Sequence, residues 1–600
     1  MAARTLFHVL EETASRYGDA AALHQPVTGK GPVRYRSYTW NEFRDAAREI
    51  ACGLRSCGIG RGDVVALHSE TRAEFYLADM GAIGNGCIAA ALYTSLPPGD
   101  HVRTVAAARP KALFVENRKV LEGLRNAGVE LEDVLKVVLD GEASEDCIGL
   151  DALRERGSEA LRKDPGSFQR HLDELTREDY AVLYLTSGAT GEPKMGLVTQ
   201  GALVDNIELG GIVKLGPEDS ALAFLPSAHI AQRLAVEFLP IGYGTPVWFS
   251  EGLSKMPIEL KQVRPTFLLA PPRVWERVYA NVSNEVKKKP APVRNLFYAA
   301  LGLGLRAADL RNQGKPVPLW MKRALALADK LVFRTVRERL GGRLRLPVSG
   351  AAPLGRDLAR FFQAIGMPLF EGYGLTEGGI TMLNPLDNVR AGSIGKPFPG
   401  VEIRIAEDGE LLIKSPTLFS GYLNDPEATA AVLRDGWLYT GDIAEMDADG
   451  YLYITGRKKE LIVSSNGKKI YPARIESLFK VEPLVNQILL VGDRQPYVTA
   501  LITINSSAAE TLPGMETLKG ASPEQVATAQ PVHKAVDDAV KRINRQLGQF
   551  EQIRRFHILE RDFSIERGEL TPTMKVRRKQ VLDNYKQVVS ELYLGREEMV

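Results

Sequence analysis

Cysteine is scarce in this chain, and the few cysteines are not arranged as a bridge framework or a metal site. Four occur among 600 residues, without a C-x-x-C pair or a cluster with histidine. This pattern argues against a disulfide-stabilised scaffold and against a cysteine-based metal centre. Free thiols in a reducing compartment are the simplest interpretation of Cys52, Cys57, Cys87 and Cys147.

A long apolar run is also missing. The longest uncharged stretch, residues 80–99, is interrupted by glycines and prolines. We therefore expect a buried helix, a turn and a buried strand there, and not a membrane span. The first residues lead into a charged helical pattern without the apolar centre of a signal peptide. These absences predict a cytoplasmic protein, with peripheral contact at a membrane left open.

Neither sign of charge dominates. The chain has 76 Lys and Arg against 74 Asp and Glu. This balance gives no overall attraction to nucleic acid, and we expect no nucleic-acid partner. Hydrophobic content of 44% and charged content of 25% are ordinary for a soluble globular enzyme. Six hundred residues are too many for one compact core, so we expect at least two domains.

Most of the chain alternates helical and strand patterns. Up to about residue 390, helices such as 39–57 are followed by short apolar strands such as 64–67. This alternation predicts a layered α/β domain with largely parallel sheets. From 392 to 456 short strands are joined by turns such as Asp408-Gly409 and Asp449-Gly450, the strongest local hairpin signal. We interpret this region as a small antiparallel β-barrel subdomain.

A second α+β pattern follows the basic stretch Arg457-Lys458-Lys459. Pro472 can begin a helix, and strands are expected near 487–491 and 498–504. A long amphipathic helix is expected from about 531 to 547. We therefore place a hinge at 457–460, between an N-terminal domain of residues 1–456 and a C-terminal domain of residues 461–600.

Residues 283–345 form a distinctly basic segment. They carry 15 Lys and Arg against 4 Asp and Glu, and their apolar residues recur at roughly helical spacing. One interpretation is a solvated helical insertion with a basic face. The other is a surface that docks on anionic membrane lipid.

The strongest chemical signal lies in the loop after the apolar run Ala181–Leu185. Its sequence runs Tyr-Leu-Thr-Ser-Gly-Ala-Thr-Gly-Glu-Pro-Lys from Tyr184 to Lys194. Backbone N–H groups, hydroxyls and one ammonium can surround a polyphosphate in such a loop. It is not a Walker A loop, because Pro193 precedes the lysine and Met195 follows it. Taken alone, the same stretch also fits a flexible surface loop.

Later motifs place this loop in a wider pattern. Together they resemble the adenylate-forming (AMP-binding) superfamily, and within it the long-chain fatty acyl-CoA synthetases. The resemblance implies a large layered αβαβα N-terminal domain with a small β-barrel subdomain, and a small mobile α+β C-terminal domain. The motifs follow one another in order along nearly the full chain, at 224–233, 270–276, 348–354, 371–377, 436–442, 456–462 and 570–575.

The resemblance implies an ATP-dependent ligase. It would convert a fatty acid to acyl-AMP with release of pyrophosphate, and then transfer the acyl group to CoA to make acyl-CoA. Mg²⁺ is the implied cofactor, with Glu377 and Thr186 as ligands. Thr376 touches the α-phosphate, and Asp442 accepts hydrogen bonds from the ribose with Arg457 nearby. The phosphates are held by Thr186, Ser187, Gly188, Thr190, Gly191 and Lys194, and the base lies near Gly350, Ala351, Glu371, Gly372, Tyr373 and Gly374.

Three further residues are implied to act in catalysis with Thr376. Lys575 bridges the fatty carboxylate and the α-phosphate, Lys459 is the hinge for a domain rotation, and His229 lines the carboxylate end of the acyl pocket. Each also has a simpler interpretation. Lys575 lies in a solvated charge run, Lys459 in a basic linker, and a lone histidine such as His229 is often a packed core residue.

The chain departs from the family pattern at three positions. Ala189 replaces a threonine, Met195 a glycine and Gln200 a histidine. Two alternatives remain open. One is an enzyme that passes acyl-AMP to a carrier protein, and the other is a non-catalytic acyl- or nucleotide-binding relative, which Ala189 and Met195 allow. The preference for long chains rests on hydrophobic burial. Each methylene of a fatty acid that is buried contributes about 0.8 kcal/mol to its binding free energy, so a deep acyl-binding tunnel would favour long chains.

Overall fold

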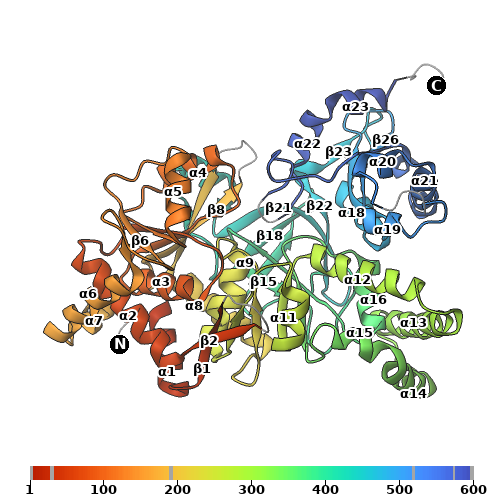
Figure 1. Ribbon diagram of the computed structural model, residues 1–600. Helices are drawn as coiled ribbons and strands as arrows, with labels where there is room; N and C mark the ends of the chain where they lie inside the picture. The colour runs from red at the N-terminus through yellow and green to blue at the C-terminus, as the bar shows by residue number, and fades with distance from the viewer. Residues whose placement is uncertain (1–3, 28–32, 188–192, 516–519, 572–573, 595–600) are drawn as a thin grey trace.

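The computed structural model describes residues 4–27, 33–187, 193–515, 520–571 and 574–594. The N-terminal half occupies the left and centre of Figure 1, and the C-terminal residues form a separate lobe at the upper right. Strands β21 (Trp437–Met446) and β22 (Leu452–Arg457) lie between these parts. The predicted combination of a large N-terminal and a smaller C-terminal domain is confirmed.

One large sheet carries the phosphate-loop strand. It has eight strands, and its central ones are parallel while β9 and β19 are antiparallel to their neighbours. The apolar run Ala181–Leu185 lies within β8, as predicted. In order across the sheet the strands are β19 (Gly421–Tyr422), β9 (Pro193–Thr199), β8 (Tyr180–Ser187), β4 (Ile88–Ala91), β3 (Val64–His68), β5 (Ala112–Val115), β6 (Leu135–Val138) and β7 (Ile148–Gly149).

A second sheet of nine strands is likewise parallel at its centre. Antiparallel strands stand at both of its edges. The largely parallel character expected from the alternating pattern is therefore confirmed in both sheets. In order these strands are β16 (Lys396–Pro397), β15 (Gly379–Leu383), β14 (Phe370–Leu375), β13 (Leu346–Ser349), β12 (Phe267–Ala270), β10 (Ala221–Ala223), β11 (Val247–Phe249), β1 (Ala21–Val27) and β2 (Arg34–Thr39).

Helices α3 (Ala73–Gly84) and α8 (Gln200–Gly210) pack between the two sheets. Each contacts strands of both sheets, and every residue of α3 is buried. A helix that is apolar all round suits such a central position. The uncharged stretch 80–99 accordingly contains the end of α3 and strand β4. No helix among the described residues combines the length and apolar character that crossing a bilayer requires.

A helix on the outer face illustrates how local sequence sets an element boundary. Helix α2 (Trp40–Ser56) begins after Thr39, whose side chain accepts from the backbone N–H of Glu42. The Glu42 carboxylate accepts in return from the Thr39 backbone N–H at 2.7 Å. This reciprocal capping box satisfies two N–H groups that a helix start leaves unpaired. The helix predicted for residues 39–57 is confirmed.

The region 402–457 is antiparallel, as its turn pattern predicted. Asp408-Gly409 joins β17 (Glu402–Ile405) to β18 (Glu410–Lys414), and Asp449-Gly450 joins β21 to β22. Gly409 has φ +86° and Gly450 has φ +81°, values that glycine adopts without strain. With β20 (Leu433–Arg434) these strands form one five-stranded sheet.

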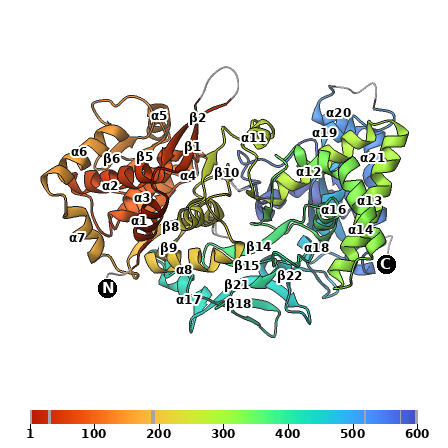
Figure 2. The same cartoon turned by 90° about the horizontal axis from the view of Figure 1, so that it is seen from below.

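The basic segment 283–345 folds as helices on the right of Figures 1 and 2. The Asp309 carboxylate on α13 pairs with Arg360 on α16 at 2.8 Å, which fixes α13 to the core. Helix α14 projects below it at the lower right of Figure 1. The elements here are α12 (Pro272–Lys287), α13 (Ala291–Asn312), α14 (Leu319–Ala328), the π-helix η3 (Asp329–Phe333), α15 (Arg334–Glu338) and α16 (Arg356–Ala364).

The C-terminal residues have a sheet and a hydrophobic core of their own. Strands β25 (Val485–Val491), β26 (Val498–Ile504) and β27 (Ile553–Ile558) form the sheet. Helices α18 (Pro472–Leu478) and α21 (Gln530–Asn544) pack residues such as Ile475 and Val536 into the core. The helix at Pro472, the two strands and the long amphipathic helix were all predicted from the sequence.

Candidate active site

A cavity of about 2490 Å³ lies between the N-terminal sheets, the antiparallel subdomain and the C-terminal domain. Residues from seven separate sequence motifs meet on its walls. The described site residues that were predicted from sequence and line it are Lys194, His229, Gly350, Ala351, Glu371, Gly372, Tyr373, Gly374, Thr376, Glu377, Asp442, Arg457, Lys459 and Lys575.

The remaining predicted residues belong to the phosphate loop itself. Gly188, Thr190 and Gly191 lie outside the described residues, and for Thr186 and Ser187 only the backbone of β8 is described. Strands β8 and β9 pair in the antiparallel direction as far as Ser187 and Pro193.

Asp442, on strand β21, lines the cavity. Only 3% exposed, its carboxylate accepts from the Tyr373 hydroxyl at 2.6 Å and pairs with Arg457 Nε at 2.9 Å. The β21–β22 register sets Asp442 directly opposite Arg457. Asp442 raises the pKa of Arg457, while burial and Asp442 raise the pKa of Tyr373. Each carboxylate oxygen keeps a lone pair for a further donor, such as a sugar hydroxyl.

Strand β14, which carries Tyr373, packs closely against the backbone of β15. A Cβ at Gly374 would lie 2.5 Å from the Gly379 carbonyl oxygen, so the β14–β15 pairing itself requires glycine there. At Gly350 there is ordinary space, and Ala351 beside it adopts φ +71°. Burial raises the pKa of Glu371 to about 7, and its Oε1 accepts from the Leu354 N–H at 2.9 Å.

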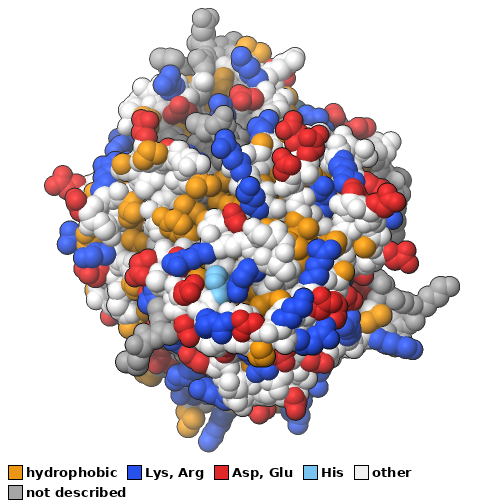
Figure 3. Space-filling view, turned by 90° about the vertical axis from the view of Figure 1, so that its left-hand side faces the viewer, with side chains coloured by type: hydrophobic (Ala, Val, Ile, Leu, Met, Phe, Trp, Pro, Cys, Tyr) orange, Lys and Arg blue, Asp and Glu red, His pale blue; other side chains and the backbone are white. Residues whose placement is uncertain are grey.

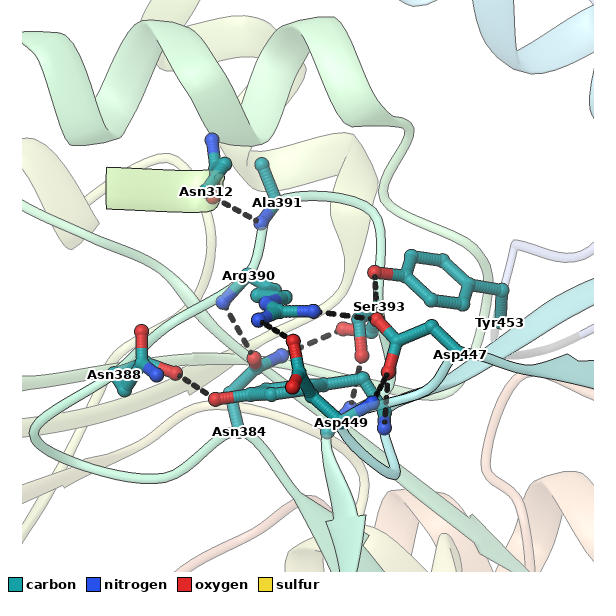
Figure 4. A network of polar contacts seen from close by, with 11 residues as sticks. Asn312, Asn384, Asn388, Arg390, Ala391, Ser393, Asp447, Asp449 and Tyr453 are labelled. Carbon is teal, nitrogen blue, oxygen red and sulfur yellow. Dashed lines mark hydrogen bonds and ion pairs between the residues drawn. The ribbon is translucent and has the colours of Figure 1, made fainter. Parts of the chain in front are cut away.

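A polar network beside β14 fixes the loop that follows β15 (Figure 4). The Arg390 guanidinium binds Asp447 at 2.6 Å and Asp449 at 2.5 Å, and its backbone N–H donates to Asn384. Asn384 Nδ2 in turn donates to the Glu371 carbonyl at 3.2 Å. The network thus connects the turn between β21 and β22 to the strand that carries Glu371 and Tyr373.

Glu377 and Lys194 both contact Tyr422, a residue that the motifs did not indicate. The Tyr422 hydroxyl donates to Glu377 Oε1 at 2.6 Å, and Lys194 Nζ lies 4.9 Å from the centre of the Tyr422 ring. The described residues hold no cluster of three or more potential metal ligands. A single carboxylate fits Mg²⁺ that arrives with phosphates, because this ion is usually bound through one or two carboxylates plus phosphate oxygens.

Lys575 reaches the cavity from the C-terminal domain on a tight turn. The Thr571 N–H donates to the Lys575 carbonyl at 2.8 Å, and the Lys575 N–H donates to Thr571 Oγ1 at 3.0 Å. The Lys575 side chain is exposed within the cleft, whose walls surround the ammonium and partly desolvate it. This desolvation and the nearby Arg457 lower the pKa of Lys575 to about 8, whereas Asp442 and Glu377 act to raise it.

His229 lines the cavity just before helix α9. Its Nδ1 accepts from the Ala231 N–H at 3.1 Å and caps the short helix α9 (Ile230–Gln232). Burial and the Lys575 ammonium lower the pKa of His229 to about 3. The ring is therefore neutral near pH 7, and its proton is on Nε2, which makes that nitrogen a donor. Of the two interpretations drawn from sequence, the structure favours a residue that lines the pocket.

A fully buried ion pair lies directly behind this loop. Arg233, the first residue of the π-helix η2 (Arg233–Phe238), binds Asp79 of α3 at 2.5 Å. Burial and Asp79 raise the pKa of Glu237 well above its usual range. The Glu237 carboxyl is therefore held in its neutral form beside the ion pair. This arrangement was not predicted from the sequence, although Arg233 ends one of the motifs.

The C-terminal domain docks on helix α12. Lys480 pairs with Glu276 at 3.1 Å, the Arg273 guanidinium donates to Asn486, and the Tyr279 hydroxyl donates to the Val481 carbonyl at 3.2 Å. Lys459 lies in the 3₁₀ turn η4 (Lys458–Glu460) between β22 and this domain. These contacts hold the orientation in which Lys575 enters the cavity.

Family models match both parts of the chain. Residues 10–423 match the AMP-binding enzyme model, and residues 459–597 match the AMP-binding enzyme C-terminal domain. The chain belongs to the AMP-binding enzyme family. It is 35% identical over 565 residues to the long-chain-fatty-acid–CoA ligase FadD15 of Mycobacterium bovis, covering 92% of each protein. To the ligase ACSBG1 of Bos taurus it is 28% identical, covering 98% of this chain and 85% of that protein.

Solved structures of the AMP-binding family share this fold. The adenylation domain of a carboxylate reductase from Mycobacterium chelonae has a TM-score of 0.75 at 22% identity, covering 98% of this chain and 91% of that one. The anthranilate CoA ligase AuaEII, in complex with anthranoyl-AMP, has a TM-score of 0.72 at 18% identity, covering 98% and 99%. The predicted fold class is confirmed by these similarities.

Proposed function

We propose that the protein activates a long-chain fatty acid with ATP and then transfers the acyl group to CoA. The observation that carries this proposal is the position of Lys575. Lys575 lines the same cavity as His229, Asp442 and Glu377. Its ammonium lowers the pKa of His229, and the two carboxylates favour its charged form. The long-chain class comes from the names of the relatives, which align over nearly the whole chain.

In the first step a carboxylate oxygen of the fatty acid attacks the α-phosphorus of ATP. A bond forms between them, and the bond to pyrophosphate breaks. The two reactants are anions, so fixed positive charge is needed where they meet. Lys575 supplies it between the two, Thr376 donates to the α-phosphate, and the pair Asp442–Arg457 fixes the ribose. Glu377, with Thr186 as the proposed second ligand, would hold Mg²⁺, and the ion would supply positive charge to the phosphates.

In the second step the sulfur of CoA attacks the acyl carbon, and AMP leaves. This step needs the space that Lys575 occupies. We assign the change of orientation to the segment 457–460, with Lys459 as the hinge between residues 1–456 and 461–600. Contacts across α12, such as Glu276–Lys480, must separate for the rotation.

The test is mass spectrometry of one reaction that contains purified protein, Mg-ATP, CoA and fatty acids from short to very long. Acyl-CoA concentrated in long chains is the expected result. Acyl-AMP without acyl-CoA would instead assign the protein to carrier loading. The absence of both products would contradict a ligase and favour a binding role.

A second proposal concerns the basic segment 283–345, which we infer to contact an anionic membrane surface. Exposed positions recur every three or four residues from 319 to 339. Trp320, Leu327 and Leu331 are 62%, 59% and 57% exposed on this face. Lys322, Arg323, Lys330 and Arg334 are also exposed beside them.

An apolar stripe flanked by cations suits the headgroup region of a bilayer, with tryptophan at the boundary. On the face of the molecule drawn in Figure 3, by contrast, acidic and basic side chains are interspersed. A ligase docked in this way would take its substrate from the surface in which fatty acids dissolve.

Sedimentation with vesicles tests this second proposal. We expect the protein to bind vesicles with anionic lipid more strongly than vesicles of neutral phosphatidylcholine. The triple variant Trp320→Ser, Leu327→Ser, Leu331→Ser should lose binding. The matched control is Ile258→Ser, because Ile258 is 60% exposed on a different helix, α11 (Met256–Val263). Equal binding by the triple variant and the native protein would contradict the proposal.

A further inference from the structure

Tyr422 contacts both charged groups at the phosphate end of the cavity. Its hydroxyl donates to Glu377 Oε1 at 2.6 Å, and its ring lies under Lys194 Nζ, 4.9 Å from the ring centre. The side chain is only 8% exposed. Burial and Glu377 raise the pKa of Tyr422 well above its usual value, so the hydroxyl remains a donor at neutral pH.

The backbone around Tyr422 ties the two charged groups together. Strand β19 pairs with the phosphate-loop strand, with Tyr422 opposite Gly196, two residues after Lys194. In the same segment, the Phe419 N–H donates to the Glu377 carbonyl at 2.9 Å. One short stretch of chain therefore holds the strand of Lys194 on one side and the turn of Glu377 on the other.

The ring itself has little freedom to move. The Tyr422 backbone N–H donates to Thr429 Oγ1 at 2.8 Å, and Phe419 packs edge-on against the ring at 5.0 Å between centres. A hydroxyl fixed in this way can orient a carboxylate, and a fixed aromatic face can hold an ammonium above it. The two contacts use different parts of the side chain, so substitution can separate them.

We propose that Tyr422 is a positioning residue for the metal–nucleotide substrate. Its hydroxyl engages one oxygen of Glu377 and thereby turns the other toward magnesium. Its ring holds the Lys194 ammonium at the height of the phosphates. This inference rests on the proposed function, since it takes Lys194 and Glu377 to serve Mg-ATP.

Calorimetric binding of ATP at a series of Mg²⁺ concentrations tests the proposal without relying on turnover. In Tyr422→Phe the ring remains and the hydroxyl is lost. We expect the Mg²⁺ concentration for half-maximal ATP binding to rise about tenfold, the order of one lost hydrogen bond to a charged group. ATP binding without metal should be unchanged in this variant.

Tyr422→Leu removes both contacts and should also weaken ATP binding in the absence of metal. The control is Tyr497→Phe, which loses a single hydrogen bond to the Leu592 carbonyl in the C-terminal domain. It should leave both measurements as in the native protein. The double variant Tyr422→Phe, Glu377→Gln should show no larger Mg²⁺ effect than Glu377→Gln alone, because the hydroxyl acts through that carboxylate.

Each outcome bears on a specific claim. A native Mg²⁺ dependence in Tyr422→Phe, or additive effects in the double variant, would overturn the inference. If the native protein binds ATP without any influence of Mg²⁺, the proposed function fails first. Should Tyr422→Leu fail to fold, Tyr422→Phe still decides the question, because it removes one atom and keeps the packing.

Discussion

The two ends of the active-site cavity are built on different principles. At the proposed nucleotide end, charged and polar side chains from separate motifs pair across short contacts: Asp442 forms an ion pair with Arg457 and accepts a hydrogen bond from Tyr373. At the proposed acyl end, the apolar residues Ala228, Ile230 and Ala231 line the cavity beside His229, which is neutral because burial lowers its pKa to about 3. Fixed charge serves a polyphosphate, whereas an alkyl chain requires its absence. Lys575 is the cation that lies near both.

The largest expected effect is that of removing the Lys575 ammonium, which lies near both ends. In Lys575→Ala we expect the adenylation rate to fall about 10²–10³-fold, since one aligned charge is lost where charge develops. The measurement is pyrophosphate release in the absence of CoA. Lys586→Ala, a lysine of helix α23 (Lys586–Glu591) that does not line the cavity, is the control. Equal rates for the two variants would remove Lys575 from the first step.

Asp442→Asn weakens the nucleotide end alone. A hydrogen bond to a charged group contributes about 1.5–3 kcal/mol, so ATP should bind about 10–100-fold more weakly. Fatty acid binding should be unchanged, because Asp442 lies away from the acyl end. Calorimetry with each substrate checks both expectations. Equal losses for ATP and fatty acid would mean that the two ends are not independent.

The pH profile separates the two ends without mutation. The Lys575 pKa is about 8, so its ammonium is present below that pH and is lost above it. The adenylation rate should therefore fall up to tenfold per pH unit above about 8. His229 stays neutral at every pH above about 3 and should add no feature between pH 5 and 8.

Two variants test which group causes the alkaline decline. His229→Gln should keep the same shape, and Lys575→Arg should move the alkaline decline to higher pH. An alkaline limb that stays in place in Lys575→Arg would show that another group titrates.

The smallest effect is expected where the C-terminal domain docks. Glu276→Gln breaks the partly exposed pair with Lys480, and such pairs contribute about 0–1 kcal/mol. Adenylation should slow by a factor of about 2–5, because the orientation shown is held less firmly, while thioester formation is unaffected or faster. Single-turnover measurements of each step provide the check. A slower second step would contradict the docking role.

The charged end was largely predictable from the sequence, and the acyl end was not. Charged and glycine-bearing motifs such as Glu371–Glu377 keep a fixed spacing, because nucleotide phosphates and ribose present fixed geometry. Each predicted residue whose side chain is described lies on the cavity wall. The turns at Asp408-Gly409 and Asp449-Gly450 were predictable for a similar local reason.

What could not be predicted depends on contacts between distant segments. Tyr422 reaches Glu377 across 45 residues, and Arg233 reaches Asp79 across 154. Nothing in the local pattern of either segment encodes such a pairing. The glycine at 374 was assigned to the base, yet the β14–β15 pairing demands it independently.

Strand β19 also has a consequence for how the molecule is assembled. Its two residues, Gly421 and Tyr422, come from beyond the nine-stranded sheet in sequence, yet they complete the edge of the eight-stranded one next to β9. During synthesis, more than two hundred further residues must therefore be made after β9, which bears Lys194, before the strand that pairs with its outer edge is available. Until then its N–H and C=O groups form an open edge, the kind of surface that pairs with other chains. The nucleotide end is thus among the last parts of the N-terminal domain to close, which couples the competence to bind ATP to completion of the fold.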